Sequence, residues 1–170
     1  NQITGYLRYA NPNDDSPSEH EFDTPLPPSE ITTTGLFFEI PQTAEKAILG
    51  QVDSFEEYLS GLHAVEHALI SLYPSEVLCD RGDIGGLSTV SHPQTVGGTV
   101  FVHDGYPGGA GYCRAAFEQL NSLLEQTADL LDSCGCADGC PSCIHSPHCG
   151  NGNRSLSKSI AAELLANLLQ

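Results

Sequence analysis

The sequence predicts an α+β fold with a small mixed or antiparallel sheet, about three helices and a cysteine-rich C-terminal loop. The first observation behind this class is a set of short runs rich in β-branched and aromatic residues, which are typical of strands. The second is a set of longer stretches whose apolar residues recur at helical spacing. The third is the crowding of five of the seven cysteines between positions 134 and 149. A chain of 170 residues is long enough to bury one core, so we expect one domain.

Three segments are predicted to form strands. Ile3–Ala10 is apolar and aromatic, and it precedes residues 11–30, which are rich in Pro, Asp and Ser and are expected to form a loop. Thr33–Ile40 has the composition of a second strand, and Thr99–His103 is β-branched enough to lie inside a sheet. Asp80–Gly86, by contrast, is rich in turn-forming residues.

The most regular helical pattern follows Ser54, where apolar residues recur every three or four positions as far as Leu72. Ser54 is a suitable N-cap, because Glu57 stands three residues later as in a capping box. Pro74 is expected to end this helix.

Two further helices are predicted in the second half of the chain. One runs from Cys113 to Leu131 and follows the glycine-rich connection Asp104–Gly111, and the other is Ser155–Gln170. We therefore describe residues 1–133 as a core with a strand, glycine turn and helix. Residues 134–170 form a cysteine loop with the last helix, and we expect the two parts to pack as one domain.

The chain is strongly acidic, with 22 Asp and Glu against 6 Lys and Arg and a net charge of −16. Tight DNA binding needs clustered cations, so this balance argues against a domain that grips DNA by itself. A halophilic source and an ordinary acidic bacterial domain are two interpretations of the same charge. Any surface that approaches nucleic acid or a motor domain should include four of the six cationic side chains, Arg81, Arg114, Arg154 and Lys158. The alternative is that these cations form ordinary ion pairs with the abundant carboxylates.

The ends and the hydropathy of the chain lead to three expectations. The sequence begins at Asn1 and contains no Met, which suggests a piece excised from a longer protein. No secretion signal is recognisable, so a cytoplasmic location is expected. No apolar run approaches the roughly 20 residues that cross a bilayer, so we expect no membrane partner.

The cysteine cluster predicts a structural zinc site. Cys140 and Cys143 form a C-x-x-C knuckle that directs two thiolates at one ion, and Cys136 and Cys149 flank it. We predict these four as the ligands of one zinc ion, which leaves no open coordination position and therefore no hydrolytic role.

Other assignments of these cysteines stay open. Disulfides and a redox C-x-x-C are alternatives, although five cysteines cannot all pair and Pro141 places the knuckle in a loop. Cys134, His145 and His148 are each close enough in sequence to replace one of the four predicted ligands.

A rival metal site is present in the first long helix. His63, Glu66 and His67 fit H-x-x-E-H, in which two histidines hold zinc and the glutamate acts as general base of a metallopeptidase. A third ligand would have to come from Glu118, Glu125 or elsewhere. The alternative is that both histidines are packed and hydrogen-bonded, since they continue the apolar stripe.

The glycine-rich connection allows two interpretations. The segment 107–111, Pro-Gly-Gly-Ala-Gly, could offer backbone N–H groups to an anion such as a DNA phosphate, but it lacks the pattern and the lysine of a nucleotide-binding loop. The alternative is a sharp turn that lets the helix pack closely on the sheet, with Asp104 as a turn-forming residue.

Several motifs together resemble the C-terminal zinc-binding domain of MrfA-type (mitomycin repair) DEAD/DEAH-box helicases. They are GCPSCIHSPHCGNGN with the following Leu-Ser-Lys helix, HDGYPGGAGY, CDRGDIGG and HAVEHALI, in the order of the family. The resemblance covers essentially the whole chain, from the opening GY strand to the last helix.

The resemblance implies an accessory domain behind the motor domains of an ATP-dependent DNA-repair helicase, with DNA as a partner through the parent protein. It carries the four zinc-binding thiolates onto Cys136, Cys140, Cys143 and Cys149. It also carries the strand and glycine-loop element onto residues 104–111. This chain has no ATP-binding motif, so we expect no enzymatic activity from it alone. A metallopeptidase and a standalone acidic module that binds a basic protein remain the alternatives.

Overall fold

The computed structural model describes residues 5–8, 18–24, 26–27 and 30–169, and the chain divides into two compact units, residues 1–31 and 32–170. The first unit contains an antiparallel pair, β1 (Gly5–Arg8) and β2 (Ser18–Glu21). The first predicted strand therefore contains β1, and the rest of Ile3–Ala10 lies outside the described residues. The loop prediction for residues 11–30 was wrong at β2, whose Ser-Glu-His-Glu sequence carries no apolar alternation.

The second unit contains a three-stranded antiparallel sheet in the order β3-β5-β4, which confirms the predicted α+β class. Its strands are β3 (Gly35–Glu39), β4 (Ile84–Thr89) and β5 (Thr99–Asp104), and both outer strands pair with β5. Two of these strands follow their predicted segments closely. β4 was missed, because Gly85 and Gly86 stand where a turn was expected.

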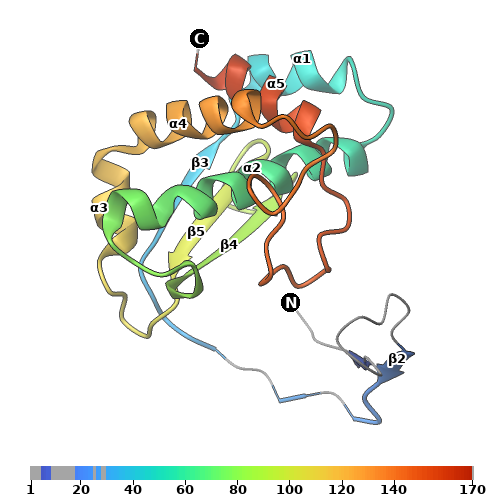
Figure 1. The fold of residues 1–170 in the computed structure, drawn as a ribbon, viewed down its shortest axis with the longest axis vertical. Helices are drawn as coiled ribbons and strands as arrows, with labels where there is room; N and C mark the ends of the chain where they lie inside the picture. The colour runs from blue at the N-terminus through green and yellow to red at the C-terminus, as the bar shows by residue number, and fades with distance from the viewer. Residues whose placement is uncertain (1–4, 9–17, 25, 28–29, 170) are drawn as a thin grey trace. The chain divides into compact units, whose positions relative to one another are not determined.

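The central helix is α2 (Phe55–Val77), which lies against the sheet in Figure 1 and packs on β4 and β5. Its start is as predicted, since Ser54 Oγ accepts a hydrogen bond from the Glu57 amide at 3.1 Å. Its end is not, because the helix continues through Pro74 to a left-handed residue, Leu78. Pro74 lies in the last turn, where it removes one amide donor while the helix still buries Tyr73 completely.

Four more helices surround α2, so the unit has more helices than the three expected. They are α1 (Gln42–Leu49), α3 (Tyr112–Glu118), α4 (Leu120–Ser133) and α5 (Lys158–Leu168), and a short 3₁₀ turn covers Arg81–Asp83. The single helix predicted from Cys113 to Leu131 is two helices, because Gln119 leaves the helical region at φ −127° and ψ 25°. The segment of α1 was not predicted as a helix.

The last helix is part of the same packed unit as the sheet. α5 contacts α1, α2 and α4, and it lies so close to Gly61 of α2 that an added Cβ would clash with Ile160. The loop between α4 and α5 crosses beside α2 in Figure 1, and it carries the five clustered cysteines. The fold therefore brings the cysteine loop onto α2.

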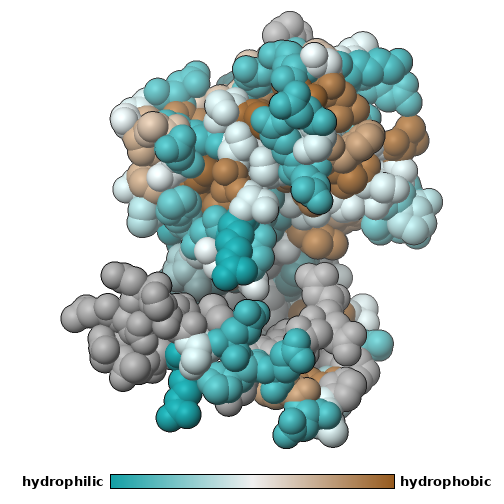
Figure 2. Space-filling model, turned by 90° about the vertical axis from the view of Figure 1, so that its right-hand side faces the viewer, coloured by the Kyte–Doolittle hydropathy of each residue, from teal (hydrophilic) through white to brown (hydrophobic). Residues whose placement is uncertain are grey.

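The surface of the described residues combines hydrophilic and hydrophobic side chains. Figure 2 shows hydrophobic patches between hydrophilic residues on one face of the chain. The most exposed large apolar side chains are Leu78, at 92% of its full exposure, and Val96, at 78%. Among the described residues, no helix combines the length and the apolar character that crossing a membrane requires.

Candidate metal centre

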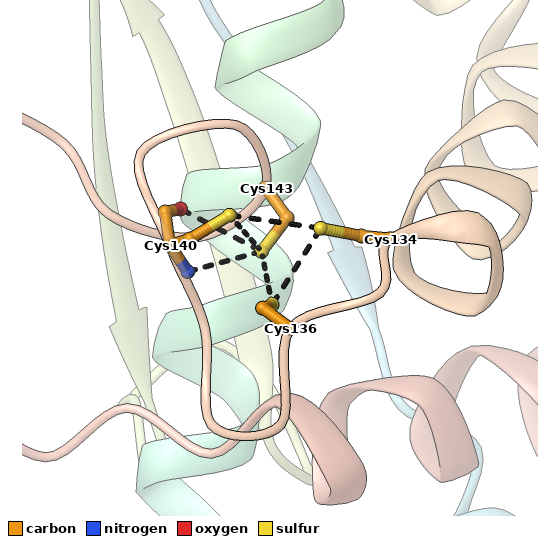
Figure 3. Close-up of side chains that lie close together, drawn as sticks. All are labelled: Cys134, Cys136, Cys140 and Cys143. Carbon is orange, nitrogen blue, oxygen red and sulfur yellow. Dashed lines mark hydrogen bonds between the residues drawn. The ribbon is translucent and has the colours of Figure 1, made fainter.

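Four thiol groups converge in the loop that follows α4. This four-cysteine cluster consists of Cys134, Cys136, Cys140 and Cys143, whose sulfur atoms all lie within 4.8 Å of one another (Figure 3). Four of the sulfur-to-sulfur distances are 3.5, 3.5, 3.6 and 3.7 Å. All seven cysteines of the chain are free thiols, so the disulfide interpretation finds no support here.

The local backbone explains why these sulfurs meet. Cys134 is the C-cap of α4, and its amide donates to Leu130 O at 3.1 Å, so the end of the helix places the first sulfur. In the knuckle, the amides of Cys143 and Ile144 donate to Cys140 O at 3.0 and 3.1 Å and form a tight turn. Ile144 is 1% exposed and anchors this turn in the core.

The cluster has the dimensions of a zinc site. Four sulfurs placed about 2.3 Å from a zinc ion at the corners of a tetrahedron lie about 3.8 Å apart, close to the distances seen here. Hydrogen bonding from the Ser142 amide, followed by contacts with the neighbouring thiols, lowers the pKa of Cys140 to about 7. The residues therefore fit a metal that binds thiolates and leaves no coordination position open.

Lys158 supports the cluster from α5. Its ammonium donates to Cys134 O at 2.6 Å and to Cys136 O at 2.8 Å. These bonds tie the first half of the loop to the start of α5. The side chain proposed from the sequence as a nucleic-acid or motor contact is thus engaged inside the domain.

The structure brings together three of the four ligands predicted from the sequence and places the fourth elsewhere. Cys136, Cys140 and Cys143 meet at the cluster, where the fourth sulfur belongs to Cys134. Cys149 lies beside His63, with Cys149 Sγ 3.7 Å from His63 Nε2. The available signal was the C-x-C pair that begins at Cys134, directly after α4, which gives four cysteines within ten consecutive positions.

The H-x-x-E-H motif does not form the arrangement of a metallopeptidase. Glu66 contacts β4, where it hydrogen-bonds with Ser88 and would touch a Cβ added at Gly86. Burial raises the pKa of Glu66 to about 7 against the opposing effect of the Ser88 bonds. The two histidines instead face the cysteine loop, where His67 Nδ1 lies 2.7 Å from Ile144 O. Glu66 is therefore hydrogen-bonded to β4, whereas the two histidines are hydrogen-bonded to the cysteine loop.

The glycine connection is a turn built around Asp104, not an empty anion site. Asp104 Oδ2 accepts from the amides of Ala110 and Gly111, both at 2.7 Å, and Oδ1 accepts from the Cys113 amide at 2.9 Å. Burial works to raise the pKa of Asp104, but these hydrogen bonds outweigh it and the pKa is lowered. The amides that could have met a phosphate are already paired, those of Ala110 and Gly111 with this carboxylate and those of Gly108 and Gly109 with backbone carbonyls. Gly108, at φ 80°, supplies the left-handed backbone that the turn needs.

The remaining predicted contact residues are exposed arginines. Arg81 lies in the 3₁₀ turn, Arg114 on α3 and Arg154 in the loop before α5. They come from three separate elements, and none of them belongs to the four-cysteine cluster.

Comparison with known proteins places the chain in a family. The family model described as the MrfA Zn-binding domain matches residues 65–144. An uncharacterized protein of Methanocaldococcus jannaschii is 36% identical over 111 residues, which are 64% of this chain and 99% of that protein. The ATP-dependent helicase YprA of Bacillus subtilis is 34% identical over 119 residues, which are 70% of this chain and 15% of the helicase.

A structural comparison agrees with the sequence comparisons. The crystal structure of the DUF1998 helicase MrfA bound to DNA matches with a TM-score of 0.65 and 26% identity, over 92% of this chain and 19% of that one. This chain thus spans less than a fifth of each of these two helicases. The chain belongs to the family of MrfA-type zinc-binding domains, and it binds one structural zinc at a four-cysteine cluster.

Proposed function

We propose that this chain is the zinc-stabilised accessory domain of an ATP-dependent DNA-repair helicase, in which it braces the motor domains and helps to define the path of a DNA strand. The observation that carries the proposal is the match of nearly the whole chain to part of a helicase whose structure contains DNA. The four-cysteine cluster and the relatedness to YprA support the same assignment.

The ligand set that we propose for the zinc is Cys134, Cys136, Cys140 and Cys143. These sulfurs come from the end of α4 and from the loop, and Lys158 connects the same loop to α5. A zinc ion here would fix the relative positions of α4, α5 and α2, since the loop also packs on α2 through Ile144. Its role is architectural because four thiolates fill the coordination shell.

The charge of the domain indicates how it would act near DNA. With a net charge of −16, the domain would repel the phosphate backbone over most of its surface. We therefore propose that it acts on DNA through the parent protein, and that Arg81, Arg114 and Arg154 are among the side chains available to phosphates or to acidic motor surfaces. Exposed apolar residues such as Leu78 and Val96 are available for the contact with the motor.

The experiment is a Cys140→Ser/Cys143→Ser double variant of the full-length parent protein. We expect it to lose zinc and DNA unwinding while it still binds ATP, because the nucleotide site lies outside this domain. Cys79→Ser is a control, since Cys79 does not belong to the four-cysteine cluster. Full unwinding by a double variant that contains no zinc would overturn the proposal.

A standalone interaction module is the second candidate, and one observation favours it. The Methanocaldococcus jannaschii relative is covered almost entirely by the alignment, so a protein with little more than this domain exists. Sequencing the gene region distinguishes the two candidates. Helicase motifs in the same reading frame support the accessory domain, and their absence supports an acidic module that binds a basic partner.

A further inference from the structure

A second group of metal-ligand side chains lies outside the four-cysteine cluster. One ring nitrogen of His63, one of His67 and the sulfur of Cys149 lie within 4.8 Å of one another. The two histidines are one helical turn apart on α2, and their ring centroids are 4.4 Å apart. Cys149 comes from the loop between α4 and α5. The fold therefore brings Cys149 to two histidines that precede it by more than 80 positions.

The hydrogen bonds of the two imidazoles determine which nitrogen carries a lone pair. A carbonyl oxygen only accepts, so His63 Nδ1 donates to Ser155 O at 3.3 Å and His67 Nδ1 donates to Ile144 O at 2.7 Å. In each neutral ring, Nε2 is then the lone-pair nitrogen. Histidines that bind metal through one nitrogen commonly donate the other N–H to a carbonyl group, which is the arrangement found here twice.

The thiol of Cys149 also presents a lone pair to this group. Cys149 Sγ donates its proton to Asn151 Oδ1 at 2.7 Å, and His63 Nε2 faces the sulfur at 3.7 Å. Nε2 and the sulfur can both direct a lone pair at one cation once the thiol has released its proton to water. In a tetrahedral zinc site with one nitrogen and one sulfur ligand, these atoms lie about 3.6 Å apart. The observed separation therefore needs almost no adjustment to bind an ion.

The loop that carries Cys149 is held in place without a metal. Asn153 Oδ1 accepts from the Ser146 amide at 2.8 Å, and Asn153 Nδ2 donates to Ser146 O at 2.9 Å. This reciprocal pair closes the loop around Cys149. His67 is 8% exposed, whereas His63 and Cys149 are only partly buried, so an ion can enter from the loop side.

We propose that His63, His67 and Cys149 form a second site for a divalent transition-metal ion, with zinc as its first occupant. Three protein ligands leave one coordination position of a tetrahedral ion open to water or to an added ligand. The site is thus unlike the closed four-cysteine cluster, and it binds its ion more weakly and exchangeably. When occupied, it fastens the loop of residues 146–155 to α2. The proposal goes beyond the helicase assignment and does not depend on it.

The test is a titration of the chain with Co²⁺ after one equivalent of zinc has filled the four-cysteine cluster. We expect one further equivalent to bind and to give a thiolate-to-cobalt charge-transfer band. Cys149→Ser should abolish the band, and His63→Gln and His67→Gln should weaken binding of the second ion at least about 100-fold, since loss of outer-shell partners alone costs up to that much. His148→Gln, at an exposed histidine beside Cys149, is the matched control and should bind as the unaltered chain does.

Retention of the first zinc and an unchanged far-UV circular dichroism spectrum verify that each variant is folded. If the buried position of His67 prevents folding of His67→Gln, the variants at the partly buried His63 and Cys149 decide the result. The proposal is overturned if the unaltered chain binds no second ion in excess Co²⁺, or if the second ion binds equally well to the variants. Neither outcome bears on DNA unwinding, so failure of this site is distinguishable from failure of the proposed function.

Discussion

Replacement of Asp104 by Asn tests the account of the glycine turn, because the side chain keeps its shape and loses its charge. The carboxylate accepts three backbone hydrogen bonds, from Ala110, Gly111 and Cys113. An Asn oxygen can serve two of these donors, and its NH₂ group then faces the third. That buried amide is left unpaired at a cost of about 1–3 kcal/mol, and the two remaining bonds each lose about 1 kcal/mol of charge assistance. We expect Asp104→Asn to lower the free energy of unfolding by about 3–5 kcal/mol.

The assay is urea unfolding of the zinc-loaded chain at pH 7, followed by circular dichroism. With a urea dependence of about 2 kcal/mol per molar, the midpoint should fall by about 1.5–2.5 M. Asp129→Asn, at an exposed position of α4, makes the same change in net charge and should stay within about 0.5 kcal/mol of the unaltered chain.

The pH dependence follows from the lowered pKa of Asp104. A carboxyl group whose pKa is lower in the folded than in the unfolded state stabilises the fold above its unfolded pKa, and this contribution disappears as the pH falls through its folded pKa. The difference between the two chains should therefore be constant above about pH 5 and should shrink below about pH 4. A difference under 1 kcal/mol at neutral pH would refute the reasoning, as would a difference that grows on acidification.

Two further predictions concern packing and the zinc loop. Gly61→Ala should destabilise the chain by about 1–3 kcal/mol in urea unfolding, because the new methyl group meets Ile160 of α5. Ile160→Ala in the same chain should recover part of this loss. Equal effects of Gly61→Ala with and without Ile160→Ala would contradict the contact. Lys158→Met should speed the extraction of structural zinc by a chelator about 10–100-fold, because no ammonium then orients the carbonyls of Cys134 and Cys136. Lys46→Met, on the exposed side of α1, is the control. Identical extraction rates from the two variants would contradict a supporting role of Lys158.

The sequence pattern predicted those elements whose residues follow a simple local rule. The start of α2 at Ser54 and the strands β3 and β5 are of this kind. β4 was missed because its glycines resemble turn residues, whereas their actual role is close packing: a Cβ at Gly85 would lie 2.5 Å from the His103 ring, and one at Gly86 would lie 2.7 Å from Glu66 Oε1. Only the neighbouring elements reveal this role.

The break between α3 and α4 could not be seen in the sequence for a related reason. The apolar spacing runs without interruption through Gln119, so the pattern of a single bent helix and that of two helices are the same. α1 was missed because its two buried residues, Ala44 and Ile48, are too few to make a periodic signal.

The presence of a zinc-binding cysteine cluster was predictable from the sequence, but the identity of its fourth cysteine was not. The clustering and the C-x-x-C knuckle identify Cys140 and Cys143 directly. The choice between Cys134 and Cys149 depends on the path of the loop, which turns back from α4 and sends Cys149 to α2 beside His63. Spacing along the chain contains no information about that path. For the same reason, Lys158 was interpreted as a surface cation, although it binds two carbonyls of the loop.

The most direct test of the central claim is zinc K-edge X-ray absorption on the chain loaded with a single equivalent of zinc. The ligand set Cys134, Cys136, Cys140 and Cys143 predicts four sulfur neighbours at about 2.3 Å in the unaltered chain and in Cys149→Ser, and three in Cys134→Ser. A nitrogen neighbour at about 2.0 Å in the unaltered chain would contradict it, as would loss of a sulfur in Cys149→Ser while Cys134→Ser keeps all four.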